Sequence, residues 1–423
     1  MQHDGQITAA YNKTTACYDY EGGFKFVNPI INEYDIKVAN LEVTLAGKPY
    51  KGYPQFSAPD ELAQALISNG FNVILTSNNH SCDRGSKGLI RTLDVLDDLG
   101  VKHTGTFRNK EERDTNYPLI IEQNGIKVAM LNYTYGTNGL KVNTPLIVNY
   151  IDSAIIRADV ERAKSMNVDY IICNMHWGKE YLHLPDRYQK KWETFCYTLG
   201  VDMIIGGHPH TVQPIVRKTI KNKEKLTVWS MGNFVSNMSV RYTRGGVMVG
   251  AHLKKENGKV ALGKTEHCLV YVHKKQEGEV KHYYILPEFD YNTYRPGFIS
   301  SAIQSKMNLF FKDSRKLFSE HNVGVTEKTV LNNSTTVELY KRYLSTYYSV
   351  FIPNVSDTLL YDKNIGGFLH ETVDIQGKNH ILSGVFVTAD QAKGNLQFIS
   401  DCKLTENAYI VKVTPTSITR ISE

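Results

Sequence analysis

The chain lacks the features that mark a membrane-spanning, disulfide-rich or exported protein. Its longest apolar runs, such as Phe71–Leu75 and Tyr170–Cys173, are far shorter than the ~18 residues of a transmembrane helix. Its six cysteines are widely separated and include no C-x-x-C pair, which excludes zinc-ribbon and thioredoxin-like motifs and argues against a disulfide framework. Residues Met1–Gly5 contain neither a basic nor an apolar segment, so the chain as written carries no export signal.

The chain also has little excess charge of either sign. Its 49 Lys and Arg against 43 Asp and Glu leave a net charge of +6, and no dense basic block occurs, so we expect no nucleic-acid partner. A hydrophobic fraction of 41% and a charged fraction of 22% are typical of a well-packed globular protein and exclude a disordered or fibrous chain. The length of 423 residues predicts two or three domains.

Strand-like and helix-like segments alternate in the first half of the chain, which predicts an α/β arrangement. Two of the helix-like segments stop at Gly70 and Gly100, as helices commonly do, and Asn124-Gly125 predicts a tight hairpin. The predicted strands are Ile36–Leu45, Phe71–Thr76, Leu119–Glu122, Lys127–Tyr133, Val168–Met175 and Met203–Ile205, and the predicted helices are 59–70, Leu89–Leu99, Ile151–Lys164 and Arg187–Leu199.

From about residue 211 the pattern changes to antiparallel strands without helices. Near residue 290 it changes again, to two helical stretches (about 300–321 and 335–350) and then short strands from about residue 357. We therefore predict a sandwich domain over residues 1–290 and a smaller α+β accessory module over residues 291–423. The strands predicted in the middle part are Ile215–Arg217, Leu226–Ser230, Val247–Leu253, Val260–Lys264, Cys268–His273 and Val280–Leu286.

Polar side chains follow four of the predicted strands, at the point where each strand ends. Because the carboxyl ends of neighbouring strands meet at one edge of an α/β sheet, these side chains are expected to lie together. Each has an ordinary alternative, as a turn residue, a core histidine or a solvated carboxylate, but their coincidence in one chain favours a metal site. A mixed oxygen and nitrogen set suits Zn²⁺, Mn²⁺ or iron rather than Ca²⁺. The residues are Glu42, Asn79, His176, His208 and His210.

The same segments resemble the motif series of the capsule-synthesis CapA family. These are poly-γ-glutamate capsule proteins within the calcineurin-like metallophosphatase superfamily. Order, spacing and strand context all agree, and the resemblance covers about residues 1–285, whereas the region beyond residue 290 resembles no family. The segments that carry the resemblance are Asn40–Glu42, Asn78–Gly88, His176–Tyr181, Gly207–Pro214 and Ser230–Phe234.

The resemblance implies a four-layered α/β/β/α sandwich with two divalent transition-metal ions (Mn, Fe or Zn) at the strand ends. It makes Glu42 and Asn79 oxygen ligands and the three histidines nitrogen ligands. It places His80 where the superfamily has its catalytic histidine, with Asp83 orienting it. The resemblance also implies substrate contacts for Trp177, Glu180, Tyr181 and Asn233. For Trp177 and Tyr181, a role in packing is an equal alternative.

The chain departs from the family pattern at two places. In the family, a first strand ends in Gly-Asp, and that Asp is a metal ligand, whereas this chain begins with the segment that follows it, Met1-Gln2-His3. We therefore expect the codons upstream of Met1 to encode an apolar strand ending in Gly-Asp, preceded by an export signal; His3 as a substitute ligand is the lesser alternative. The second departure is Glu42, since most metallophosphatases have Asp there.

Three functions agree with these features. The first is a metal-dependent hydrolase of bacterial capsule or poly-γ-glutamate production, acting on a phosphate ester or an amide of the polymer. The second is a non-catalytic subunit that binds or assembles the polymer on the same scaffold, and the third is an ordinary phosphodiesterase or nucleotidase. The ligand series favours the first. The resemblance also implies an anionic polymer or phosphate-containing substrate, contact with membrane-bound capsule synthesis machinery, and a cell-envelope location.

Overall fold

In the computed structural model, contacts within the chain define two compact units. The first comprises Met1–Glu288 and Ser305–Lys328, and the second comprises Phe289–Gln304 and Thr329–Glu423. Each unit is described by itself. The structure describes residues 1–13, 15–277, 280–288, 300–328, 347–353, 355, 370–386, 389–401, 405, 407–414 and 417–421.

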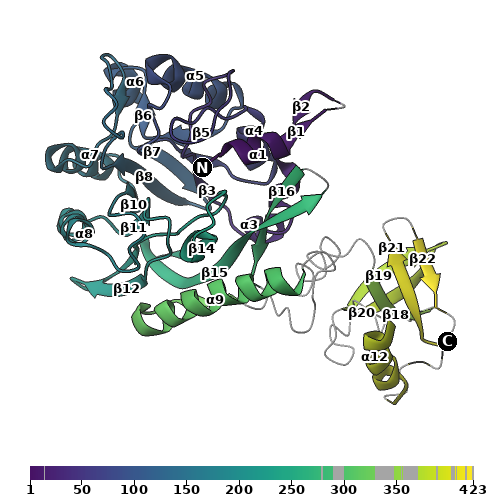
Figure 1. Ribbon diagram of the computed structural model, residues 1–423. Helices are drawn as coiled ribbons and strands as arrows, with labels where there is room; N and C mark the ends of the chain where they lie inside the picture. The colour runs from purple at the N-terminus through teal and green to yellow at the C-terminus, as the bar shows by residue number, and fades with distance from the viewer. Residues whose placement is uncertain are drawn as a thin grey trace. The chain divides into compact units, whose positions relative to one another are not determined.

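A six-stranded sheet in the order β12-β13-β11-β10-β8-β7 forms the centre of the first unit (Figure 1). The four inner strands are parallel, and β7 and β12 add antiparallel edges through the β7–β8 and β12–β13 hairpins. The predicted strands here are confirmed, most of them extended by one to three residues. Their bounds are β7 Leu119–Gln123, β8 Ile126–Thr134, β10 Tyr170–His176, β11 Met203–Gly207, β12 Ile215–Ile220 and β13 Lys223–Val228.

Two helices, α7 (Ser153–Ser165) and α8 (Arg187–Leu199), cover the outer face of this sheet (Figure 1). The Asp152 side chain accepts hydrogen bonds from two backbone N–H groups and so begins α7, and α8 ends at Gly200, whose positive φ a larger residue would adopt less readily. Apolar residues of both helices belong to one buried cluster with β8, β10 and β11, including Val160 and Cys196.

A second, three-stranded parallel sheet, in the order β3-β4-β5, faces the inner side of the six-stranded sheet. Val73 and Leu75 of β4 share a buried cluster with Met130 of β8, so the two sheets pack face to face. Helices α4 and α5 cover the other side of the small sheet, which completes the α/β/β/α order and confirms the expected fold. The bounds are β3 Val38–Asn40, β4 Val73–Leu75, β5 Lys102–Thr104, α4 Glu61–Ser68 and α5 Gly85–Asp98.

A further sheet completes the first unit: β14, β15 and β16 are antiparallel, and the short β17 pairs with β15 in parallel. One long strand, β15, replaces the two strands predicted between residues 260 and 273. The residues between the two predicted strands, Thr265–His267, are buried within β15, and Glu266 accepts a hydrogen bond from Tyr34 at 2.8 Å. The bounds are β14 Gly245–Glu256, β15 Lys259–Glu277, β16 Val280–Pro287, β17 Thr326–Glu327 and α9 Ser301–His321.

Short elements connect these layers. They lie near the amino terminus and in the crossovers between strands, where the sequence shows little hydrophobic periodicity. They are α1 Asp4–Ala10, β1 Tyr11–Asn12, β2 Cys17–Tyr18, α2 Glu21–Phe24, α3 Asn28–Ile31, β6 Thr106–Phe107, α6 Lys110–Asn116, β9 Ile147–Val148 and the 3-10 turn η1 Arg241–Thr243.

The second unit is an antiparallel sheet in the order β19-β20-β18-β21-β22, with α12 packed on it. The helix predicted over 335–350 is wrong at its carboxyl end, because Tyr347–Ile352 form β18; residues 335–346 lie outside the described part. The helix α12 was not predicted, although Ala389, Ala392, Leu396 and Ile399 follow a helical spacing and belong to one cluster with the sheet. The bounds are β18 Tyr347–Ile352, β19 His370–Ile375, β20 Lys378–Phe386, α12 Ala389–Asp401, β21 Tyr409–Thr414 and β22 Ser417–Arg420.

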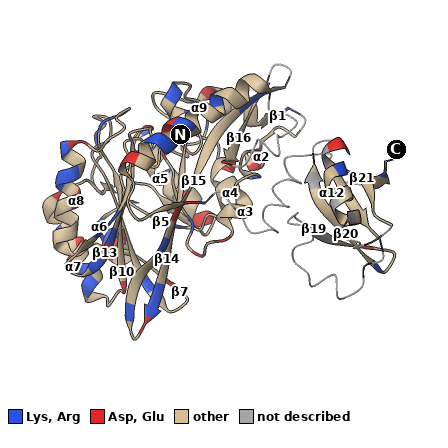
Figure 2. Cartoon of the chain, turned by 90° about the horizontal axis from the view of Figure 1, so that it is seen from below, with Lys and Arg blue, Asp and Glu red and all other residues tan. Residues whose placement is uncertain are grey.

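Charged residues of both signs lie side by side over the view in Figure 2, for example at the far end of β14, where Lys254 and Lys255 precede Glu256. This mixing agrees with the small net charge. Among the helices of the described residues, none has the length and apolar character of a membrane span.

Helix α5 offers a test of packing inside the first unit, because its buried face carries Leu93 in one cluster with Leu146 and Val148. Leu93 is fully buried in this helix, whereas Ile90, one turn earlier, is 37% exposed. We expect Leu93→Ala to lower the free energy of unfolding by about 2–5 kcal/mol through a cavity, and Ile90→Ala to cost far less. Urea unfolding followed by tryptophan fluorescence reports on this unit, because all three tryptophans lie in it. Equal losses for the two variants would contradict this packing.

Candidate metal centre

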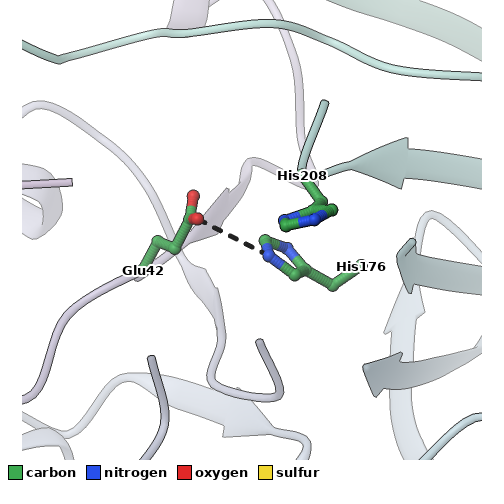
Figure 3. Close-up of side chains that lie close together, drawn as sticks. All are labelled: Glu42, His176 and His208. Atoms are coloured by element: carbon green, nitrogen blue, oxygen red, sulfur yellow. Dashed lines mark ion pairs between the residues drawn. The ribbon is translucent and has the colours of Figure 1, made fainter. Parts of the chain in front are cut away.

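The carboxyl ends of the strands bring the predicted ligands together. His176 is the last residue of β10, His208 directly follows β11, and Glu42 lies two residues beyond β3. Figure 3 shows the Glu42 carboxylate directed at the His176 ring, with the His208 ring beside it. Glu42 Oε1 lies 3.5 Å from His176 Nε2, and the ring centres of His176 and His208 are 4.9 Å apart.

Two overlapping groups of side chains in this region fit a metal ion. Glu42, His176 and His208 form the first, and all three are buried; exposed Glu180 with His208 and His210 forms the second. In each group the ligand atoms lie within 4.8 Å of one another, and His208 belongs to both. Glu180 was predicted only as a substrate contact. The argument from strand ends did not place it beside these histidines.

Two ligand-type atoms of this cluster are buried without a hydrogen-bond partner among the described residues: Glu42 Oε1 and His208 Nδ1. A buried acceptor without a partner costs about 1–3 kcal/mol. A divalent cation bound between these side chains would remove that cost, since carboxylate oxygen and imidazole nitrogen are both suitable ligands. The donor set therefore fits a transition-metal ion.

Burial keeps these imidazoles neutral, the form that binds metal. Desolvation, followed by the neighbouring His210 and His80, lowers the pKa of His208 to about 3. Desolvation also lowers the pKa of His176 well below its ordinary value, with further contributions from the nearby histidines. Protons therefore compete for these nitrogens only in strongly acidic solution.

Asn79 and Asn233 orient the histidines. The Oδ1 of Asn79 lies 2.8 Å from His176 Nε2, which places this predicted ligand at the cluster. The Oδ1 of Asn233 lies 3.1 Å from His210 Nδ1, and its amide donates to the Thr243 carbonyl at 2.9 Å. A bond from His210 Nδ1–H to Asn233 leaves Nε2 of that ring as the free nitrogen. The predicted contact of Asn233 with substrate stays a prediction.

His80 lies next to the cluster and is held by Asp83. Its Nδ1 is 2.7 Å from Asp83 Oδ2, and the same carboxylate oxygen accepts the Phe56 backbone N–H at 2.7 Å. The Phe56 ring stands edge-on to the imidazole at 4.6 Å between centres. These contacts fix the ring plane and leave Nε2 as the nitrogen that can exchange a proton with a ligand.

The loop after β11 has a strained backbone. His208 and His210 have φ values of 97° and 59°, a region that residues with a side chain rarely adopt. Such strain is found where a site requires it. Gly206 precedes this loop because a Cβ there would lie 2.1 Å from the Trp229 carbonyl oxygen. The sequence pattern does not reveal the strain of the two histidines.

Of the residues expected at the rim, Tyr181 is 50% exposed and Trp177 is fully buried. Trp177 stacks on Trp229 and donates its indole N–H to that residue's carbonyl at 3.1 Å, so it takes the packing alternative. Tyr135 was missed. This residue is 39% exposed and directly follows the last residue of β8. The centre of its ring lies 4.6 Å from the centre of the His208 ring. The strand-end argument applied to β8 would have found it.

Comparisons with known proteins identify the family of the chain. The sequence model of the family "Bacterial capsule synthesis protein PGA_cap" matches residues 1–238. The chain is 27% identical over 257 residues to the capsule biosynthesis protein CapA of Bacillus anthracis, which covers 56% of this chain and 59% of that protein. It is 28% identical over 269 residues to the PGA biosynthesis protein CapA of Bacillus subtilis, covering 61% and 67%.

The matched part thus spans about three fifths to two thirds of those relatives. Among solved structures, the NAD nucleotidase NadN of Haemophilus influenzae aligns with a TM-score of 0.40 at 14% identity, over 76% of this chain and 54% of that one.

The lowered pKa of His208 predicts a loss of stability in acid for the metal-free chain. In the unfolded chain this ring takes up a proton near pH 6.5, but in the folded chain only near pH 3. Between these values the unfolded state binds more protons, so the free energy of unfolding falls as pH falls, by about 1.4 kcal/mol per pH unit for one such group.

Urea unfolding in EDTA at several pH values between 7 and 4 measures this slope. We expect the free energy of unfolding of His208→Gln to fall less steeply with falling pH than that of the wild type. The control is His252→Gln, at a half-exposed ring on β14, which should show the wild-type dependence on pH. The same slope in wild type and His208→Gln would contradict the assignment.

Proposed function

Because this chain belongs to the PGA_cap family of bacterial capsule synthesis proteins, we propose that it is a metal-dependent hydrolase of capsule or poly-γ-glutamate production. Its substrate would be a phosphate ester or an amide of the polymer. The observation that carries the proposal is the buried cluster of Glu42, His176 and His208, in which Glu42 Oε1 and His208 Nδ1 have no hydrogen-bond partner among the described residues. A structural role alone gives no reason to bury two imidazoles and a carboxylate at the ends of separate strands.

The metal would be a divalent transition ion, Mn, Fe or Zn, and we propose two of them. Glu42, His176 and His208 would hold one, with the Asn79 oxygen adjacent, and His208, His210 and Glu180 would hold the other. When bound, such ions polarise the scissile group and lower the pKa of a bound water.

The protein's own side chains would provide proton transfer and position the substrate. His80, fixed by Asp83 through Nδ1, would exchange a proton with the leaving group through Nε2. Tyr135 and Tyr181 are exposed beside the histidines and would contact the substrate with their rings. The depth of the histidines, each less than 10% exposed, limits access of bulk water to the cluster.

The partner we propose is an anionic polymer or a phosphate-containing precursor, handed over by membrane-bound capsule synthesis machinery at the cell envelope. The net charge of +6 is compatible with such a ligand. These points rest on the names of the relatives and on the family.

One observation favours a second candidate, a polymer-binding subunit without catalysis. Glu42 is the single buried carboxylate of the two metal groups among the described residues, because Glu180 is exposed. One negative charge offsets little of the charge of two divalent ions, so a cluster that holds one ion is the competing arrangement. Metal stoichiometry and the effect of removing His80 separate the two candidates.

Metal content tests the cluster directly. The purified chain, incubated with Mn²⁺, Fe²⁺ or Zn²⁺ and then dialysed, should retain metal by elemental analysis. We expect His208→Ala to lose more metal than Glu180→Gln, because His208 belongs to both groups. His252→Ala, at a half-exposed ring, serves as the control and should retain wild-type content. A wild-type chain without transition metal would refute the proposal.

Removal of His80 tests catalysis. His80→Ala should lower metal-dependent hydrolysis about 10²–10⁴-fold, with metal content unchanged. A matched control is His103→Ala, since His103 also contacts an aspartate, Asp97, at 2.9 Å, but on β5 away from the cluster. Polymer output in a strain carrying His80→Ala that equals the wild type would favour the binding role. Mn²⁺-dependent turnover of a generic phosphodiester would instead favour a phosphodiesterase.

A further inference from the structure

Four loops surround the metal centre, since they follow strands whose carboxyl ends carry its side chains. Three of them meet at the first turn of α5. Arg84 donates to the Pro49 carbonyl at 3.4 Å, and Asn143 donates to the Ser86 hydroxyl at 3.3 Å. We call the four loops, together with this first turn of α5, the rim. The loops follow β3, β4, β8 and β10 and comprise residues 41–60, 76–84, 135–152 and 177–186.

Six cations lie on the rim, and none of them forms an ion pair with a carboxylate of the described residues. Five are exposed lysines, and the sixth is a half-buried arginine. Every loop of the rim carries at least one of them, so the positive charge is spread around the metal centre. The six residues are Lys48, Lys51, Arg84, Lys87, Lys141 and Lys179.

The carboxylates of the rim are engaged by other groups. Asp60 is paired with Arg91 through two bonds of 2.7 Å. Three more accept hydrogen bonds from an imidazole or from backbone N–H groups: Asp83, Asp152 and Asp186. The remaining two, Glu42 and Glu180, belong to the two metal groups. The rim cations are therefore not neutralised by the carboxylates that share their loops.

These unpaired charges cost free energy in the protein alone. Like charges on neighbouring loops repel one another, and the divalent ions of the proposed metal centre would add to the same field. Elsewhere in the first unit cations are matched by carboxylates, for example Arg113 by Asp159 and Lys225 by Asp202, each at 2.7 Å. A ligand with several negative charges would relieve the repulsion at the rim, whereas a ligand with one charge would direct that charge to the metal ions.

The residue types of the rim indicate what kind of ligand it fits. Arginine presents a rigid fork that binds one carboxylate or phosphate in a fixed geometry, whereas lysine is a point charge on a flexible stem. Five of the six rim cations are lysines, and four of these lie in loops. Such groups can follow negative charges whose positions vary, as they do along a flexible chain. The rim therefore fits a series of charges better than a single fixed anion.

We propose that the rim binds a flexible polyanion, a chain whose carboxylates repeat along its length, so that one linkage of the chain lies at the metal centre. The inference rests on the proposed function and narrows its substrate to the multiply charged polymer rather than a small phosphate ester. A small ester would leave the rim cations unpaired. The rim therefore makes this protein selective for long chains, and its field also speeds the encounter with them.

Binding of labelled glutamate oligomers, followed by fluorescence anisotropy, tests the proposal. The measurement is made in EDTA, so that it reports on the rim and does not depend on bound metal. Compared at equal concentration of glutamate residues, an oligomer of about 20 residues should bind at least about tenfold more tightly than one of about 4, because several rim cations act on the same chain. The affinity of the long oligomer should fall steeply as salt is added, because salt screens exposed charges.

A matched pair of variants locates the binding. The rim variant combines Lys48→Gln, Lys51→Gln and Lys87→Gln, and we expect it to bind the long oligomer about tenfold more weakly than the wild type, since the modest effects of exposed charges add. The same three positions changed to Arg keep the charge and should keep the affinity. The control variant has Gln at three exposed lysines beside the amino end of β13 and between β14 and β15, away from the metal centre: Lys221, Lys223 and Lys259.

Three outcomes would overturn the proposal. The first is equal binding of the long oligomer by the rim variant and the control variant, and the second is equal affinity of the long and short oligomers per glutamate residue. The third is tighter binding of a single-stranded oligonucleotide of equal charge, which would assign the rim to another class of polyanion. None of these outcomes changes the metal content or the effect of His80→Ala, so the rim can fail while the proposed function stands.

Discussion

The parallel pairing of β8, β10 and β11 is the constraint on which the metal centre depends. In this pairing His176 lies opposite Gly207, so the residue after Gly207, His208, comes directly beside it. Thr134 lies opposite His176 on the other side, and this brings Tyr135 to the same edge. The alignment follows from hydrogen bonds along seven residues of β10, not from contacts between the polar side chains. The register of the strands therefore determines where these side chains meet.

Burying these polar side chains at the strand ends costs free energy, and several local features reflect that cost. Three imidazoles and a carboxylate are buried at the strand ends, and desolvation holds His176 and His208 in the neutral form. The turn that carries His208 and His210 also has an unfavourable backbone conformation at both residues. Unpaired buried atoms, lowered pKa values and positive φ angles occur at the same few residues, and a sequence selected for stability alone would avoid each of them.

Much of this arrangement was predictable because it depends on periodicity and on strand ends. The alternation of strands and helices gave the α/β class, the resemblance to the CapA family implied the four layers, and the polar residues that follow Ile205 and Val38 marked the edge of the site. The long strand β15 was harder, because Glu266 looks like a solvated residue unless its partner Tyr34, 232 positions away, is known. Glu180 was missed as a neighbour of the histidines for the same reason, whereas Tyr135 directly follows β8 and could have been found from that strand end. Contacts between distant loops leave no trace in local spacing.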